Sequence, residues 1–271
     1  MNSSPASTDT PSSNKWAMAG RHAFRILAGF PRFFFAHPVD ALKLFGARLR
    51  YFFSRRFAGP IATSDGFLIE TREELISYWS FFVERECLTP EWVNLLLSET
   101  KPLIVDVGAN AGLFSHRVWT LKPGAEFILF EPLPRMGRKI EQWAKKTSVT
   151  HTLHKKAVSD QCGKMTFYAA TDNDTSASLI PEDDKSLKYD VEVVTLDSVI
   201  PDRPILMMKI DVEGVETRVL AGAKRTLERA RFIILEAHTQ EALAPIKQAL
   251  GPQWMDKQVG ASDYLFIKRG K

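Results

Sequence analysis

The sequence predicts an α/β fold of the Rossmann-like kind, because a strand, a glycine turn and a helix follow one another directly. Leu103–Val105 is an unbroken apolar run, typical of a strand buried on both faces. Gly108–Gly112 forms a tight turn, and residues 113–121 continue at helical spacing. A second apolar run, residues 126–130, supplies the next strand. This order is that of a nucleotide-binding βαβ unit.

The ends of these two strands predict a site for a nucleoside. Glu131 follows the second strand and lies 23 residues after Gly108. A carboxylate at this spacing can accept hydrogen bonds from both hydroxyls of a ribose. The glycines let the backbone approach a ligand, and the N-terminus of the next helix offers free N–H groups. A buried βαβ unit of unrelated use is the alternative.

The glycine turn does not match the fingerprint of dinucleotide-binding proteins. That fingerprint is Gly-x-Gly-x-x-Gly, whereas this chain has Gly108-x-Asn110-x-Gly112. Asp106 precedes the first glycine, where its charge would repel a pyrophosphate and suit a cationic ligand with an amino group. S-adenosylmethionine has a ribose, a sulfonium and an α-ammonium, and it has no phosphate. We therefore expect Asp106, Gly108, Asn110, Gly112 and Glu131 to bind this cofactor.

These motifs resemble the FkbM family of S-adenosylmethionine-dependent methyltransferases over residues 102–238. Five segments carry the resemblance: Val105–Gly112, Phe130–Pro132, Ala157–Asp160, Met208–Glu216 and Leu220–Gly222. Lys209–Gly214 (Lys-Ile-Asp-Val-Glu-Gly) is the block most specific to the family. The resemblance implies a class I methyltransferase fold, with a mostly parallel seven-stranded sheet, helices on both faces and one antiparallel strand near the end. It also implies methyl transfer to a hydroxyl.

A further strand end adds polar residues to the predicted site. Open α/β sheets bind ligands at the carboxyl ends of their strands, so Asp211 and Glu213 should share a crevice with Asp106 and Glu131. Lys209 lies inside the same strand, and a buried lysine is costly unless a carboxylate pairs with it. We expect Lys209 to pair with one of these carboxylates.

His238 is the first candidate for the general base that removes the hydroxyl proton. It follows the predicted strand at residues 232–236, and histidine titrates near neutral pH. Asp211 and Glu213 are the next candidates, with Lys209 beside them. A structural hydrogen bond is the alternative role for His238.

Asp160 follows the predicted third strand, residues 150–158. The resemblance implies that it accepts a hydrogen bond from the adenine amino group; a turn aspartate is the alternative. Some sugar methyltransferases recruit a divalent metal through carboxylates, and Asp211, Glu213 and Glu236 offer such groups. Their spacing does not indicate a metal site.

The chain divides by composition into a tail, an extension and one domain. Residues 1–14 are rich in Ser, Thr and Pro and should be disordered. Residues 15–60 form a basic, aromatic, helical extension, and residues 61–271 form the methyltransferase domain. In that domain, residues 61–100 are an N-terminal helical cover, and residues 101–271 are the catalytic core.

Periodicity predicts the elements of the cover and the rest of the core. The cover has a hairpin or turn at Ser64–Gly66, a capping box at Thr71 and Glu74, and a helix over residues 73–86. Packing of this helix against the sheet is favoured, and Tyr78, Trp79 and Arg72 are candidates for a lid over the active site. In the core, further strands are expected at residues 164–170, 191–196, 254–259 and 264–268. Residues 205–214 are expected to form another strand together with the loop that leaves it. Helices are expected at residues 215–229 and 240–250.

The extension concentrates positive charge and aromatic side chains. Residues 1–60 hold nine Lys and Arg and two acids, a net charge of +7. One helical face gathers five apolar side chains: Leu42, Phe45, Leu49, Phe52 and Phe53. No run approaches the roughly 18 apolar residues of a membrane span. A basic amphipathic helix over residues 15–57 suits an anionic membrane surface and a lipid-linked acceptor. Packing of these aromatics on the catalytic domain is the alternative.

Composition restricts the other partners. The two cysteines, Cys87 and Cys162, are far apart, which favours a reducing compartment and disfavours a disulfide framework or a zinc site. We expect a cytoplasmic protein, peripheral on the membrane face, with no nucleic-acid partner. The expected acceptor is a hydroxyl of a sugar, glycolipid or secondary metabolite. A nicotinamide-dependent oxidoreductase and a non-catalytic, membrane-associated nucleoside-binding module are the alternatives.

Overall fold

The computed structural model describes most of the predicted domain and part of the extension. It covers residues 31, 33–54, 60–84, 87–169, 187–212, 214–237, 239–260 and 262–270. The predicted tail, residues 1–14, and the candidate residues Glu213 and His238 lie outside the described residues. What was predicted for them stays a prediction.

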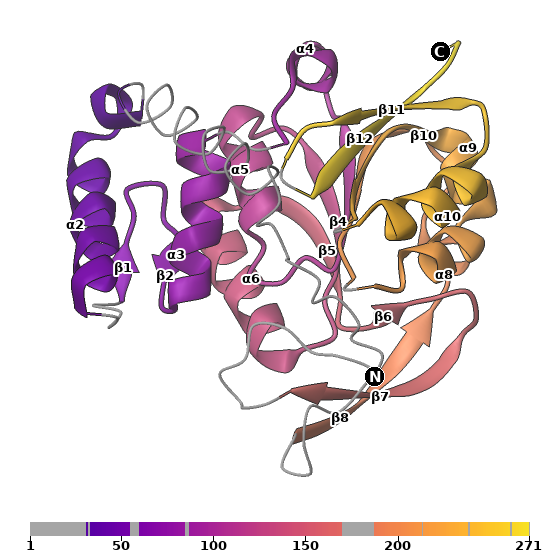
Figure 1. Cartoon of the computed structure of the whole chain (residues 1–271), viewed down its shortest axis with the longest axis horizontal. Helices are drawn as coiled ribbons and strands as arrows, with labels where there is room; N and C mark the ends of the chain where they lie inside the picture. Colours follow the sequence, from indigo (N-terminus) through magenta and orange to yellow (C-terminus); the bar gives the residue numbers. More distant parts are fainter. Residues whose placement is uncertain are drawn as a thin grey trace, which may run out of the picture.

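A seven-stranded sheet forms the centre of the molecule, in the order β11-β12-β10-β9-β3-β4-β5 (Figure 1). Five neighbouring strands are parallel: β10 (Ala230–Glu236), β9 (Ile205–Ile210), β3 (Leu103–Val107), β4 (Glu126–Phe130) and β5 (Thr150–His154). β12 (Asp263–Lys268) pairs antiparallel with β10 and with β11 (Trp254–Gln258). β12 is therefore the one reversed strand of this sheet, and the predicted mostly parallel seven-stranded sheet is confirmed.

Side chains of the central strands alternate between two hydrophobic cores. Ile104 of β3 joins the core formed with α4 (Pro90–Ser98), α5 (Leu113–Leu121) and α6 (Pro134–Thr147). Val105 and Val107 join the core formed with α8 (Glu216–Ala221) and α10 (Gln240–Leu250). Successive residues of a strand point to opposite faces, so helices on both sides bury β3 completely. Figure 1 shows α5 and α6 on one side of the sheet and α8 to α10 on the other.

The strand predicted at residues 150–158 is two strands. β5 ends at His154, and β6 (Ala157–Val158) leaves the main sheet to pair with β8 (Leu187–Val194). β7 (Gly163–Ala169) pairs antiparallel with β8 and completes a separate three-stranded sheet. The sequence of residues 150–158 did not show that the chain passes from one sheet to another there.

The helix predicted at residues 215–229 is also two elements, α8 and α9 (Lys224–Arg229), and the short α7 (Leu196–Val199) lies against α9. The break falls at Gly222. A Cβ atom on Gly222 would lie 2.2 Å from the carbonyl oxygen of Ser159. The chain that follows β6 therefore passes directly over the break, where a side chain has no room.

The N-terminal cover begins with a two-stranded hairpin, β1 (Ile61–Ala62) and β2 (Leu68–Ile69). The predicted capping box starts α3 (Arg72–Tyr78): Glu74 N donates to the Thr71 hydroxyl, and the Glu74 carboxylate accepts from Thr71 N. The helix predicted over residues 73–86 is helical throughout its described part, residues 73–84, but from Trp79 its regular turns give way to a π-helix, η1 (Trp79–Glu84). π-helical turns occur often at functional sites.

Buried ionic contacts hold the cover on the core. The buried Glu74 carboxylate pairs with Lys139 of α6. Asp65 of the hairpin accepts from the Tyr78 hydroxyl at 2.9 Å and lies 3.4 Å from His116 Nε2 of α5. Burial opposes ionisation of Asp65, but His116 and the neighbouring hydroxyls outweigh it and hold its pKa at about 2. The cover is thus tied to the two helices that flank the glycine turn.

The helix of the extension, α2 (Pro38–Ser54), packs through the side opposite to the predicted apolar face. Ala41 and Leu44 are fully buried, whereas Leu42 and Phe45 are 62% and 44% exposed. The alternative that the aromatics of the extension pack on the protein is therefore wrong for Phe45, but it agrees with Phe33, which is buried in the core. Figure 1 places α2 at the edge of the molecule, beyond the cover. None of the helices described is long and apolar enough to cross a membrane.

Gly222→Ala should destabilise the fold, because the new methyl group meets the backbone of Ser159. We expect the free energy of unfolding to fall by about 1 to 3 kcal/mol, as for other overpacked sites. Thermal denaturation followed by circular dichroism measures the change. Gly163→Ala is the matched control, since its Cβ would meet no atom within 4 Å. Equal stability of the two variants would contradict the close approach at Gly222.

Candidate active site

Hydrogen bonds join the carboxyl ends of β3, β4 and β9. Gly108 N and Ala109 N both donate to Phe130 O at 3.0 Å, and Asp211 N donates to Val107 O at 3.0 Å. The loop after β3 is thereby attached to the ends of both neighbouring strands. The prediction that Asp106, Glu131 and Asp211 share one edge of the sheet agrees with this arrangement.

The two glycines of the turn are required by their surroundings. Gly108 has φ +77°, and a Cβ on it would lie 1.8 Å from the carbonyl oxygen of Asp211. Gly112 has φ +78°, and a Cβ on it would lie 2.5 Å from Trp143 Nε1. Asn110 also has a positive φ, 52°, which asparagine tolerates better than most residues. The two glycines of the motif therefore stand where the backbone packs closely against the Asp211 carbonyl and the Trp143 ring.

Glu131 is held in a defined orientation at the mouth of β4. Its two carboxylate oxygens accept from Asn110 N and from Leu133 N, each at 2.8 Å. Each oxygen keeps a free lone pair, so the carboxylate can still accept from a ligand. The bond to Asn110 also connects Glu131 to the glycine turn.

The ionisation of Glu131 falls within the physiological range. Burial raises the pKa of Glu131 to about 7, although the two backbone N–H groups favour its charged form. The charges of Asp106 and Asp211 raise this pKa further. Glu131 therefore gains its full charge only when the pH exceeds neutrality or when a ligand compensates for the lost hydration.

Lys209 and Asp211 form the predicted ion pair. Lys209 is buried, and its Nζ lies 2.5 Å from Asp211 Oδ2. Burial opposes the charge of Lys209, but the carboxylates of Asp211 and Asp106 outweigh it and raise its pKa above the usual range. Lys209 thus stays protonated at neutral pH. It can hold Asp211 in its charged form, but it cannot accept a proton.

Asp106 lies beneath the glycine turn and is fully buried. Ser115 Oγ donates to its Oδ2 at 2.6 Å, and among the described residues no donor reaches Oδ1. Burial raises the pKa of Asp106, while Lys209 and Ser115 act in the opposite direction. A buried carboxylate with an open acceptor position is a costly feature unless a ligand or water uses it.

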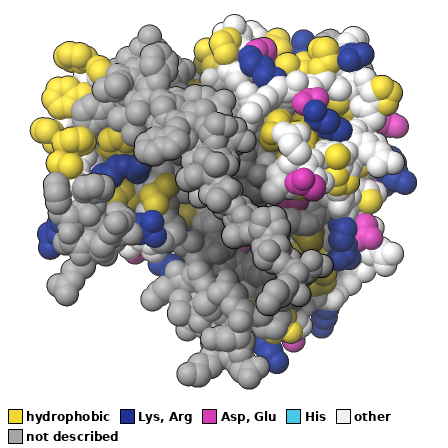
Figure 2. All heavy atoms as spheres, viewed as in Figure 1, with side chains coloured by type: hydrophobic (Ala, Val, Ile, Leu, Met, Phe, Trp, Pro, Cys, Tyr) yellow, Lys and Arg dark blue, Asp and Glu magenta, His cyan; other side chains and the backbone are white. Residues whose placement is uncertain are grey.

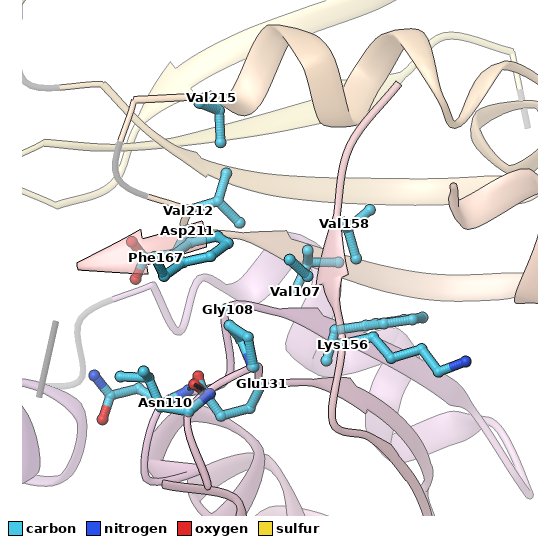
Figure 3. Close-up of a pocket in the computed structure, with 14 residues that line it drawn as sticks. Val107, Gly108, Asn110, Glu131, Lys156, Val158, Phe167, Asp211, Val212 and Val215 are labelled. Atoms are coloured by element: carbon cyan, nitrogen blue, oxygen red, sulfur yellow. Dashed lines mark hydrogen bonds between the residues drawn. The ribbon is translucent and has the colours of Figure 1, made fainter. Parts of the chain in front are cut away.

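A pocket opens between the ends of β3, β4 and β9 (Figure 3). Gly108, Asn110, Glu131 and Asp211 supply its polar wall. The remaining lining is mostly apolar and comes from several elements: Val107, Phe130, Pro132, Leu133, Lys156, Ala157, Val158, Phe167, Val212 and Val215. A pocket with one polar and one apolar wall can receive a ligand that has both polar and apolar parts.

Sequence reasoning missed most of the apolar wall. Phe167 comes from β7 of the small sheet, and the close-up shows its ring in the group near Val212 and Asp211 (Figure 3). Its strand was predicted, but nothing in the pattern indicated that this strand crosses to the pocket. Val158 and Val215 likewise look like ordinary core residues in the sequence.

A second cavity lies on the other side of the glycine turn and shares Gly108, Asn110 and Asp211 with the first. The cover and the core both line it: Glu74, Ser77, Phe81, Ala109, Ala111, Leu113, Phe114 and Lys209 complete its wall. The cover residues are neighbours of Tyr78 and Trp79, which were candidates for a lid. Tyr78 and Trp79 are buried instead, and neither lines the cavity.

Asp160 lies apart from both cavities. Its carboxylate accepts from Arg218 Nε at 3.0 Å and from Ser159 Oγ at 2.9 Å, and these bonds lower its pKa. It does not line either cavity. The geometry favours the turn role over the adenine contact, and the contact stays a prediction.

The described part of the chain contains no group of three or more His, Cys, Asp or Glu side chains arranged to hold a metal ion. Glu236, named as a potential ligand, accepts from Ser262 Oγ at 2.6 Å. The structure does not describe Glu213 or His238, so their predicted catalytic roles are untested.

Comparison with known proteins identifies the family. A family model described as the Methyltransferase FkbM domain matches residues 106–255, more than half of the chain. The chain belongs to the FkbM methyltransferase family. It is an S-adenosylmethionine-dependent methyltransferase, as the motifs at the strand ends suggested.

Two relatives of this FkbM-family methyltransferase have named activities. The 2-O-methyltransferase NoeI of Sinorhizobium fredii (strain NBRC 101917 / NGR234) is 29% identical over 164 residues, covering 54% of this chain and 67% of NoeI. The 31-O-demethyl-FK506 methyltransferase FkbM of Streptomyces tacrolimicus is 29% identical over 194 residues, covering 58% and 74%. Among solved structures, the METTL16 MTase domain matches with a TM-score of 0.46 and 11% identity, covering 89% of this chain and 91% of that one.

The described residues fit the cofactor of this FkbM-family enzyme. In the described part of the site, three carboxylates, Asp106, Glu131 and Asp211, lie around the buried Lys209, and this surplus of acids favours a cationic ligand over a phosphate. The carboxylate oxygens of Glu131 can each accept a further hydrogen bond, as binding of ribose hydroxyls requires, and the expected contact of Glu131 with the ribose stays a prediction. When bound, S-adenosylmethionine supplies an activated methyl group.

Binding of S-adenosylmethionine should strengthen as the pH rises through 7, because ribose hydroxyls donate to the charged form of Glu131. With a pKa of about 7, the ionised fraction and hence the affinity should rise about tenfold between pH 6 and pH 8. Calorimetric titration at several pH values measures this slope. Glu131→Gln should bind more weakly and lose the slope. A slope that survives in Glu131→Gln would assign the titration to another group.

Proposed function

We propose that this enzyme transfers the methyl group to a hydroxyl of a small molecule, such as a sugar, a glycolipid or a secondary metabolite. The observation that carries the proposal is the position of Asp211. Asp211 lines both the pocket between the ends of β3, β4 and β9 and the second cavity, so its side chain lies where the two meet. The names of NoeI and FkbM describe those relatives as O-methyltransferases, which supports the same class of acceptor here.

The Lys209–Asp211 pair provides the chemistry that a hydroxyl acceptor needs. A carboxylate can accept the hydroxyl hydrogen bond, orient the oxygen and take its proton as transfer proceeds. Lys209 keeps this carboxylate charged and fixes its position, since the two groups are 2.5 Å apart. Asp211 is therefore our candidate for the general base among the residues that the structure describes. His238 and Glu213 stay alternative proposals for the same role.

The second cavity supplies a plausible site for the acceptor. Phe81 and Phe114 give it apolar surface, and Ser77 gives it a hydroxyl that can bind polar groups. Phe81 and Ser77 belong to the cover, so the acceptor would contact both the cover and the core. This mixed lining supports an acceptor with apolar and hydroxyl-bearing parts.

Product analysis tests the proposal. The enzyme is incubated with S-adenosylmethionine and a panel of sugars, glycolipids, alcohols and amines, and methylated products are identified by mass spectrometry. We expect methyl ethers. Methylated amines alone would contradict hydroxyl transfer. Cofactor binding without turnover of any acceptor would favour the non-catalytic binding module. Family membership already argues against the nicotinamide oxidoreductase.

Asp211→Asn should lower kcat by about 100-fold or more, the usual contribution of a general base, with a much smaller change in cofactor affinity. Lys209→Met should also lower kcat, because Asp211 loses its partner. The surface ion pair Lys247–Asp256, at 2.7 Å, provides matched controls. Lys247→Met and Asp256→Asn should keep wild-type kcat. An unchanged kcat in Asp211→Asn would move the base to His238 or Glu213.

A further inference from the structure

An apolar stripe runs along the outer side of the extension helix. We call it the outer stripe; its residues and exposed fractions are Phe35 84%, Val39 60%, Leu42 62%, Phe45 44% and Leu49 42%. The spacing of three or four residues places them on one side of a helix. Hydrogen bonds from His37 N to Phe33 O and from Ala41 N to His37 O continue the helix back to Phe35. Figure 2 shows hydrophobic side chains gathered at this edge of the molecule.

The outer stripe is not part of the core. The opposite side of the same helix, with Phe33, Ala41, Leu44 and Ala47, is the side that packs on the protein. Five of the eight large hydrophobic side chains that are exposed in the described part of the chain belong to the stripe, so the exposure is concentrated rather than scattered. A contiguous exposed apolar surface of this kind marks an interaction site.

Cations of α2 border the outer stripe, and the described part of this helix exposes no acid. Lys43 follows Val39 by four residues, and Arg50 follows Lys43 by seven, so both project beside the stripe. Both are exposed and line a surface groove between α2 and β1, where Lys43 Nζ donates to Ala62 O at 3.4 Å. Asp40, the one acid in the sequence of α2, is buried and accepts from Ser64 N at 2.8 Å.

We propose that α2 docks on an anionic phospholipid surface. The outer stripe enters the apolar side of the headgroup region, and the phosphates of the lipids lie against Lys43 and Arg50. A short helix with an apolar face, flanking cations and no exposed acid lies in the plane of a bilayer. The net charge of +7 over residues 1–60 adds attraction to the same surface. This inference does not depend on the methyl acceptor.

Vesicle co-sedimentation of the full chain tests the proposal. We expect binding to vesicles of phosphatidylcholine with phosphatidylglycerol, and at least about fivefold weaker binding to phosphatidylcholine alone. Phe35→Ser/Leu42→Ser and Lys43→Glu/Arg50→Glu should each reduce the bound fraction at least about fivefold. Phe35 and Leu42 are mostly exposed, so their replacement should leave the melting temperature unchanged.

Matched controls carry the same substitutions elsewhere. Leu97→Ser/Met255→Ser replaces side chains that are 50% and 45% exposed, and Lys101→Glu/Lys145→Glu changes the net charge by the same amount. Both controls should bind like the wild type. Failure of the wild type to bind anionic vesicles, or full binding by the stripe variant, would overturn the proposal. So would a wild-type dimer in sedimentation velocity that Phe35→Ser/Leu42→Ser converts to a monomer, because a second copy would then cover the stripe.

Discussion

The contact between the backbone of Gly108 and the carbonyl of Asp211 is the constraint on which the active site depends. The Cβ of any other residue would lie 1.8 Å from that oxygen. Because the strands β3 and β9 are neighbours in the sheet, their exits must pass each other at this point. Glycine allows the approach, and the hydrogen bonds to Phe130 and Val107 then hold the three strand ends together. The polar residues that follow those strands are brought into one group as a result.

That group of residues has an unusual charge balance. Asp106 and Glu131 are buried with raised pKa values, and Asp211 is paired with the buried Lys209. Carboxylates removed from water are unstable when charged unless a cation or hydrogen-bond donors compensate. A cationic ligand with ribose hydroxyls supplies both, so binding of the cofactor and ionisation of the site favour each other. A pocket with a surplus of acids therefore suits a cationic ligand better than a metal-free phosphate.

The cover links the active site to the extension helix. Glu74 completes the capping box of α3, pairs with Lys139 of the core and lines the second cavity. Asp40 of α2 accepts from Ser64, which lies in the hairpin of the cover, next to Asp65 and its contact with His116. A chain of polar contacts therefore runs from α2 to the helix behind the glycine turn. If α2 lies on a membrane, the second cavity keeps a defined position relative to that surface.

Local patterns in the sequence were sufficient to predict the buried strands, the capping box at Thr71, the glycine turn and the polar residues at the strand ends, whereas the mostly parallel seven-stranded sheet was implied by the family resemblance. Each of these depends on neighbours along the chain: apolar runs for buried strands, positive φ for glycine, and strand ends that share one edge. Tertiary structure decided which side of α2 is buried, where β6 leaves the main sheet, and which side chains wall the cavities. Phe167 and Phe81 reach them from segments distant in sequence, and Asp160 pairs with Arg218, 58 residues further along the chain. Such contacts are chosen by packing between elements, and no local pattern records them.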